Sequence, residues 1–264
     1  MYTVEHRDAG DAHYEQGEYE AAVEEYSKAI ELDPTDGEAY FKRGLSRFSQ
    51  GDYAAAAEDY SEAIEIDPSD ANKYYRRGIA RQNLNQLDDA RDDYSSAVDL
   101  DPSHARAFNN RGIIHHRNGA LEEAIADYSA ALELSPSDVA ALNNRGLAWL
   151  QQDNTAEAIA DFTQAIELDP SDSTYLANRA TAWRAKARED QDLALQDYAK
   201  AIEIDPSNGT LYMNRGTLWR EVGHDYLGSL DFEKAGELDP RYRVEMPVSE
   251  AAAGDPFSGG DLEV

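Results

Sequence analysis

Apolar and polar residues alternate along this chain with the period of an α-helix. Small and apolar side chains recur three and four residues apart, as in the run from Ala56 through Tyr60 to Ile64, which places them on one helix face. A turn such as Gly51-Asp52 follows one helical stretch, and an Asp-Pro step ends the next. Proline disfavours helical geometry in the residue before it. The pattern therefore predicts antiparallel pairs of helices.

The helix pair recurs seven times. Five of the six intervals between the prolines that end the pairs are 34 residues, and the interval from Pro170 to Pro206 is 36 residues, which implies a two-residue insertion. The repeats end near residues 34, 68, 102, 136, 170, 206 and 240. A fixed period of this length predicts a stack of similar units, each of which buries its apolar face against its neighbours.

Small and aromatic residues keep the same places in successive repeats. The eighth place holds Gly10, Gly44, Gly78, Gly112, Gly146, Ala180 and Gly216. The twenty-fourth place, counted without the insertion, holds Tyr26, Tyr60, Tyr94, Tyr128, Phe162, Tyr198 and Phe232. A residue without a bulky side chain lets two helix backbones approach closely, and the aromatic ring beside it buries a large area. We expect the small residue to lie where the two helices approach closely and the aromatic ring to fill the space beside it.

These columns resemble the tetratricopeptide repeat family, and the resemblance covers residues 3–240. It implies an all-α fold, an α-solenoid of seven antiparallel helix pairs that form a right-handed superhelix, with the first helix of each pair on the concave surface. Residues 241–264 contain proline, glycine, serine and acids without apolar periodicity. They predict a flexible acidic C-terminal tail.

The net charge of the protein limits the classes of molecule that it can bind. The sequence has 264 residues with 53 acidic and 24 basic side chains, a net charge of −29. This excess opposes contact with nucleic acid or anionic lipid, because phosphate contacts need Lys and Arg. The absence of cysteine excludes disulfides and thiolate metal sites. No stretch reaches the length of a membrane span, and no signal peptide is recognisable. We expect a cytoplasmic monomer whose partner is a protein.

Signatures of catalysis are absent from the sequence. It contains no phosphate-binding glycine loop, zinc-hydrolase motif, nucleophile elbow or calcium loop. His115 and His116 are adjacent, so they point about 100° apart on a helix and are poorly placed to share one metal ion. We expect a protein that is not an enzyme and has no cofactor or metal site.

The charges of the concave face differ from those of the whole sequence. By resemblance, the groove-facing side chains occupy the second, fifth, sixth, ninth, twelfth and thirteenth places of each repeat. In repeats three to six these places hold no acidic residue, and their basic residues are Arg76, Arg106, Arg117 and Arg184. Such a channel in a negative body focuses its field onto carboxylate ligands. The alternative is that acids merely collect on the more solvated outer faces.

The sixth place carries a column of asparagines: Asn110, Asn144, Asn178 and Asn214. An asparagine side chain offers both a donor and an acceptor, so a spaced row of them can pair with the backbone of an extended peptide. The alternative is that asparagine is simply frequent at this place in the family.

The leading hypothesis is a scaffold that binds an extended, preferably acidic peptide segment in the concave groove. The candidate peptide-binding residues are Arg76, Arg106, Asn110, Arg117, Asn144, Asn178, Arg184 and Asn214. The alternative is a structural assembly subunit that docks or self-associates through its convex face and terminal repeats.

Two charged columns indicate how neighbouring repeats are aligned. The seventh place holds Arg43, Arg77, Arg111, Arg145, Arg179 and Arg215, and Ala9 in the first repeat. The twenty-third place holds Glu25, Asp59, Asp93, Asp127, Asp161, Asp197 and Asp231. An acid can pair with the arginine of its own repeat or with that of the next. We expect the second scheme, because it accounts for Ala9 in the repeat that has no predecessor.

Overall fold

The computed structural model describes residues 2–186 and 190–243. In these ranges the protein is all-helical and contains no strand, as the periodicity predicts. The helices are α1 (Tyr2–Glu15), α2 (Tyr19–Leu32), α3 (Gly37–Ser49), α4 (Tyr53–Ile66), α5 (Ala71–Asn83), α6 (Leu87–Leu100), α7 (Ala105–Arg117), α8 (Leu121–Leu134), α9 (Val139–Gln151), α10 (Thr155–Leu168), α11 (Ser173–Lys186), α12 (Gln191–Ile204), α13 (Gly209–Glu221) and α14 (Asp225–Leu238).

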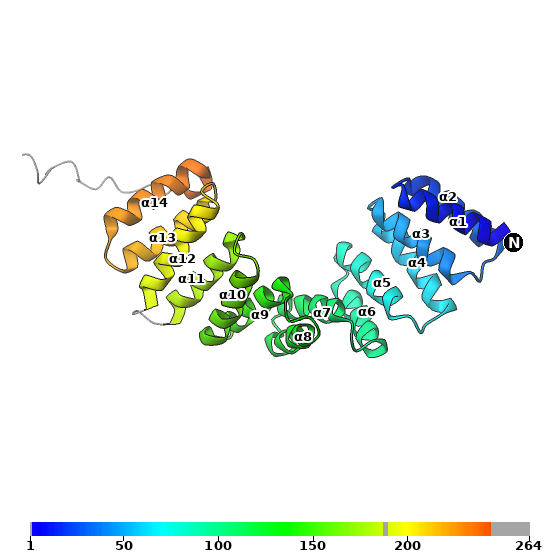
Figure 1. Ribbon diagram of the computed structural model, residues 1–264, viewed down its shortest axis with the longest axis horizontal. Coiled ribbons are helices and arrows are strands. Elements are labelled where there is room, and N and C mark those ends of the chain that lie inside the picture. The colour runs from blue at the N-terminus through cyan, green and yellow to red at the C-terminus, as the bar shows by residue number, and fades with distance from the viewer. Residues whose placement is uncertain (1, 187–189, 244–264) are drawn as a thin grey trace, which may run out of the picture. The chain divides into compact units, whose positions relative to one another are not determined.

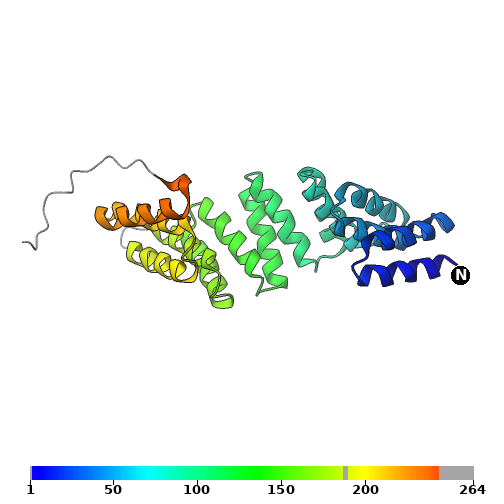
Figure 2. The same ribbon diagram turned by 90° about the horizontal axis from the view of Figure 1, so that it is seen from above.

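The helices pack as antiparallel pairs in two compact units, Met1–Pro170 and Ser171–Val264. The first unit contains α1 to α10 and the second contains α11 to α14 (Figure 1). Within each unit, the second helix of a pair also packs against the first helix of the next pair. Figure 2 shows the backbone reversing direction between the two helices of each pair. No helix in the described part of the protein has the length and apolar character needed to cross a bilayer.

Two kinds of turn separate the helices. Between the helices of every pair except α11–α12, one residue takes a positive φ, between 76° and 89° at Gly17, Gly51, Gly119 and Gly223, and near 60° at Asn85 and Asp153. Between pairs, the Asp-Pro step ends the second helix, as at Asp67.

The Asp67 side chain accepts hydrogen bonds from the backbone and hydroxyl of Ser69 and from Lys73, which together lower its pKa to about 2.

The aromatic column packs on the glycine column, as expected. A Cβ atom at Gly112 would lie 2.8 Å from the Cε1 atom of Tyr128, and the same distance at Gly78 and Tyr94 is 2.7 Å. Both rings are fully buried. The eighth place of these repeats therefore needs glycine because the ring of the partner helix rests directly on the backbone.

The end of the described structure folds back onto the last helix pair. Residues Pro240–Tyr242 form a short 3-10 helix, and the Tyr242 hydroxyl lies 2.8 Å from the Thr210 hydroxyl. The Arg243 Nε donates to the carbonyl oxygen of Gly236. These residues, which the sequence assigns to the start of the tail, are thus packed against α13 and α14. Residues 244–264 of the predicted tail lie outside the described residues.

The arginine ladder forms within repeats, so the expected pairing between repeats is wrong. Arg77 Nη2 lies 2.7 Å from Asp93 Oδ1, and Arg111 Nη2 lies 2.7 Å from Asp127 Oδ1. The other pairs of the same kind are Arg43–Asp59, Arg145–Asp161, Arg179–Asp197 and Arg215–Asp231. The seventh place faces the twenty-third place across the helix pair, which leaves the acid of the preceding repeat out of reach.

The same arginines also contact the preceding repeat, but through a hydroxyl. Arg77 Nη1 donates to Ser61 Oγ at 3.1 Å, and Arg111 Nη1 donates to Ser95 Oγ at 3.3 Å. In the first repeat, where Ala9 stands, the acid Glu25 is bound by His6 and Lys28 instead, each at 2.6 Å. Arg43, Arg77, Arg111 and Arg145 therefore each join their own helix pair and tie that pair to its predecessor.

Candidate functional site

The first helices of successive repeats share one face of the first unit. Helix α1 contacts α3, and α7 contacts α9. Their groove places meet: Lys42 donates to Asp11 at 2.6 Å, and Asn144 donates to Asn109 at 3.4 Å. We call the side chains at the six groove places of α1, α3, α5, α7 and α9 the groove face.

The groove face is hollowed between α1 and α3. A pocket of about 280 Å³ is lined by Asp11, Tyr14, Glu15, Tyr26, Lys42 and Leu45. All of these except Tyr26 occupy groove places, and Tyr26 reaches the pocket from α2. The aromatic column therefore presents its hydroxyl end to the groove face here.

Three arginines on the groove face stand apart from every other cation of the first unit. Arg76, Arg106 and Arg117 form no ion pair with any residue that the structure describes. Arg106 and Arg117 are exposed, and Arg76 is half-buried. The other Lys and Arg residues of this unit are all paired with acids: Arg7, Lys28, Lys42, Arg43, Arg47, Lys73, Arg77, Arg81, Arg91, Arg111 and Arg145.

The two candidate asparagines of the first unit, Asn110 and Asn144, are half-buried and hydrogen-bonded to neighbouring repeats. The Asn110 amide donates to the Tyr94 hydroxyl at 3.5 Å, and the Asn144 amide donates to Asn109 Oδ1 at 3.4 Å. Both contacts are long, so each amide can exchange its partner for a stronger one at little cost.

The remaining candidate residues belong to the second unit. Asn178 and Arg184 lie on α11, and Asn214 lies on α13. Arg184 Nε donates to Glu221 Oε2 at 2.7 Å. The structure thus divides the predicted set between two units, with five residues in the first, and it gives Arg184 an acidic neighbour that the sequence did not indicate.

Sequence reasoning missed the groove places of the first two repeats. By the same counting they include the acids Asp8, Asp11, Glu15 and Glu38 and the cations Arg7 and Lys42. The signal was present, because the rule applied to repeats three to six assigns these residues as well. The groove face therefore changes from acidic in repeat one, through balanced charge in repeat two, to basic in repeats three and four.

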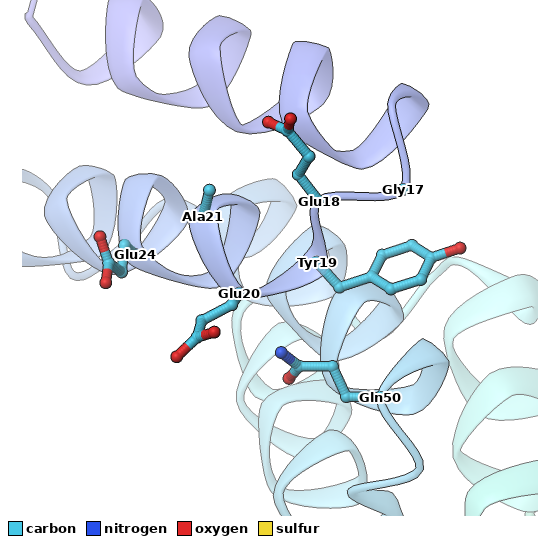
Figure 3. A pocket seen from close by; sticks show the side chains of 7 residues that line it. All are labelled: Gly17, Glu18, Tyr19, Glu20, Ala21, Glu24 and Gln50. Carbon is cyan, nitrogen blue, oxygen red and sulfur yellow. The ribbon is translucent and has the colours of Figure 1, made fainter.

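A second hollow lies away from the groove face, at the start of α2. It has a volume of about 560 Å³ and is lined mainly by Glu18, Tyr19, Glu20, Glu24 and Gln50. In Figure 3 the three carboxylates point in different directions. They do not converge on a point that a ligand could occupy, so we do not assign a site here.

Two models of known protein families match the sequence. A model described as "TPR repeat" matches residues 10–49 and 44–85, and a model described as "Tetratricopeptide repeat" matches residues 75–139, 122–173 and 143–209. No curated protein matches the sequence.

Solved structures with the same fold are numerous. YrrB, described as a TPR protein with an unusual peptide-binding site, is 25% identical with a TM-score of 0.62 over 69% of this chain and 92% of its own. MamA is 25% identical with a TM-score of 0.61 over 66% of this chain and 95% of its own. The C-terminal part of a TPR repeat-containing protein from Cytophaga hutchinsonii is 18% identical with a TM-score of 0.74 over 88% and 94%.

The repeat models together span residues 10–209, from within α1 to the end of α12. Repeats of this kind mediate contacts between proteins, and they support the role of an interaction scaffold. The chain belongs to the tetratricopeptide repeat family.

Proposed function

We propose that the groove face of the first unit binds an extended, acidic segment of a partner protein. The observation that carries this proposal is the set of three arginines without acidic partners, Arg76, Arg106 and Arg117, in a protein of net charge −29. Acids outnumber cations more than twofold, yet these three cations are left to solvent and to ligands. A bound carboxylate would form an ion pair with each of them, as Asp93 does with Arg77.

The candidate residues of the first unit have two kinds of role in this proposal. Arg76, Arg106 and Arg117 would bind carboxylates, because a guanidinium presents paired donors that match a carboxylate. Asn110 and Asn144 would exchange their long internal hydrogen bonds for bonds to the ligand backbone. The peptide-binding site named in the description of YrrB supports this use of the fold.

The second unit would contribute less charge. Asn178 and Asn214 remain candidates for backbone contacts there, whereas Arg184 is already engaged by Glu221. We propose that the protein works as a monomeric, non-catalytic scaffold in the cytoplasm.

Selection from a random library of displayed 12-residue peptides tests the proposal. Wild-type protein should enrich peptides rich in Asp and Glu, and the Arg106→Glu, Arg117→Glu variant should not. The matched control is Lys28→Glu, Arg91→Glu, which changes the net charge equally at two exposed ion pairs on second helices. Acid enrichment that persists in the groove variant, or no acid enrichment with wild type, would overturn the proposal.

A second candidate function is assembly through the last repeat. Tyr226, Leu227 and Leu230 on α14 are exposed, Tyr226 by 74%, although the corresponding places of the other repeats are mostly acidic or small. An apolar patch of this kind favours association. Light scattering over a concentration series decides: a monomer excludes this role, and an oligomer that Tyr226→Ser, Leu230→Ser dissociates supports it.

A further inference from the structure

The tyrosines of the twenty-fourth place point their hydroxyls toward the groove face, and the hydrogen-bond partners of these hydroxyls differ from repeat to repeat. Tyr26 donates to Asp11 Oδ1 at 2.6 Å. The sixth-place cation of the next repeat, Lys42, donates to the other oxygen, Asp11 Oδ2, also at 2.6 Å. A carboxylate therefore bridges a buried phenol and a groove cation between the first two repeats.

The third repeat satisfies its tyrosine in another way. Tyr94 donates to Gln82 Oε1 at 2.7 Å and accepts a long bond from Asn110, the sixth-place residue of the next repeat. No carboxylate is needed there, because neutral amides supply both an acceptor and a donor.

Tyr60, in the second repeat, has neither a carboxylate nor an amide as a hydrogen-bond partner. Tyr60 is fully buried, and its hydroxyl has no hydrogen-bond partner among the residues that the structure describes. Its ninth-place neighbour is Leu45 where the first repeat has Asp11, and its twelfth-place neighbour is Phe48 where the third repeat has Gln82. A buried hydroxyl without a partner is costly, so its retention at the groove face needs a reason.

The sixth-place cation beside Tyr60 is Arg76, and it too is unsatisfied. Its Nε atom is buried without a hydrogen-bond partner, and the side chain forms no described ion pair. Its positive charge acts on the Tyr60 hydroxyl, where it opposes the rise in pKa that burial causes. A phenol and a guanidinium thus stand together as Tyr26 and Lys42 do, but without an internal acid.

We propose that Tyr60 and Arg76 form a subsite for a carboxylate of the bound segment, which takes the position that Asp11 holds between Tyr26 and Lys42. The phenol donates one hydrogen bond and the guanidinium donates another along with its charge, which suits the carboxylate of a glutamate, an aspartate or a free peptide terminus. The long, flexible Arg76 side chain moves to admit the ligand. This subsite deepens the proposed function, on which its biological use rests, by fixing where one ligand acid binds.

Nuclear magnetic resonance on the full-length protein tests the subsite directly. The probes are N-acetylglutamate methylamide and, as the uncharged control, N-acetylglutamine methylamide, with sodium acetate compared against sodium chloride. The Arg76 Nε–H resonance should shift with the two carboxylates and not with the amide or chloride. The Tyr60→Phe variant should weaken the glutamate affinity about tenfold, since it removes one hydrogen bond to a charged group.

The unliganded variants provide a second readout. Tyr60→Phe should leave the urea midpoint equal to or above that of wild type, because it removes an unpartnered buried hydroxyl. Tyr94→Phe is the matched control. It should lower the urea midpoint, because it removes a hydroxyl that is hydrogen-bonded to Gln82. Leu45→Asp should abolish the glutamate response by supplying an internal carboxylate, as Asp11 does in the first repeat.

The outcomes separate this subsite from the proposed function. If acidic peptides bind the groove but Tyr60→Phe binds glutamate as wild type does and Arg76 shows no shift, the subsite is wrong and the proposed function stands. If the carboxylates shift Arg76 while random peptides show no acid enrichment, the subsite stands and the proposed function fails. A lower midpoint in Tyr60→Phe would also contradict the subsite, because it would reveal an internal partner.

Discussion

Two adjacent arginines of α5 show how this protein uses the same side chain in different ways. Arg77 binds Asp93 through Nε and Nη2 and reaches back to Ser61 through Nη1. Arg76, one residue earlier, has no ion pair with any described residue. Successive residues on a helix point about 100° apart, so Arg77 faces the partner helix and Arg76 faces the groove.

The contrast extends along the first unit. The ladder arginines Arg43, Arg77, Arg111 and Arg145 are anchored on two sides and mostly buried, whereas Arg106 and Arg117 are exposed and unpaired with any described acid. A ladder arginine should therefore act on stability, and a groove arginine on binding.

Removal of a ladder arginine should give the largest loss of stability. Arg111→Ala should lower the free energy of unfolding by about 3 kcal/mol, because it leaves the buried Asp127 with His115, at 3.8 Å, as its one basic neighbour among the described residues. Urea denaturation measures this loss, and Arg106→Ala should change it by less than about 0.5 kcal/mol. In double-mutant cycles Arg111 should couple to Asp127 and not to Asp93; the reverse would contradict the observed ladder.

Overfilling the space under an aromatic ring should cost nearly as much. Gly112→Ala should lower the free energy of unfolding by about 2 kcal/mol, since the added methyl meets the Tyr128 ring at 2.8 Å. Helix propensity alone predicts a gain of about 1 kcal/mol from the same change. The matched comparison is Ala180→Gly, which should cost about 1 kcal/mol. A Gly112→Ala protein more stable than wild type would contradict this prediction, because it would show that the Tyr128 ring moves aside at little energetic cost.

The ladder should be more tolerant where a second arginine shares the acid. Asp93 also accepts from Arg81 at 2.8 Å, so Arg77→Ala should cost about 1.5 kcal/mol, half the loss at Arg111. The Arg77→Ala, Arg81→Ala protein should lose as much as Arg111→Ala in the same urea experiment. Equal losses from Arg77→Ala and Arg111→Ala would mean that Arg81 contributes nothing.

The smallest effect concerns an exposed acid at a turn between repeats. Asp67 has a pKa of about 2 because it accepts hydrogen bonds from Ser69 and Lys73. The depressed value means that its contribution to stability is complete above the ordinary pKa near 4 and is lost as the pH falls toward 2. Carboxyl resonances should report this titration, and Lys73→Met should raise the pKa. An unchanged pKa would leave Ser69 as the only cause.

The sequence predicts the repeat architecture well because its columns repeat in register. Gly112 and Tyr128 could be matched in advance, since small and aromatic places have only one way to meet inside a helix pair. The partner of Arg111 could not, because Asp93 and Asp127 stand at similar separations along the sequence and only the packing angle of the helices chooses between them.

The candidate site was predictable in part. Counting places identified Arg76, Arg106 and Arg117 as groove residues, but whether a cation finds an acid depends on side chains from neighbouring repeats. Arg184 meets Glu221 in this way. The unsatisfied Tyr60 hydroxyl could not be predicted from the sequence either, because its neighbours come from other helices, α3 and α5.

The central claim is that the unpaired arginines of the groove face select carboxylates. Fluorescence anisotropy of a labelled alternating Glu-Ser peptide and its Lys-Ser counterpart, at about 0.15 M salt, tests it most directly, because screening over about 8 Å leaves only the nearest charges effective. The Glu-Ser peptide should bind more tightly to wild type, and Arg76→Gln, Arg106→Gln, Arg117→Gln should abolish the preference without lowering the urea midpoint. Equal affinity of wild type for both peptides would contradict the account.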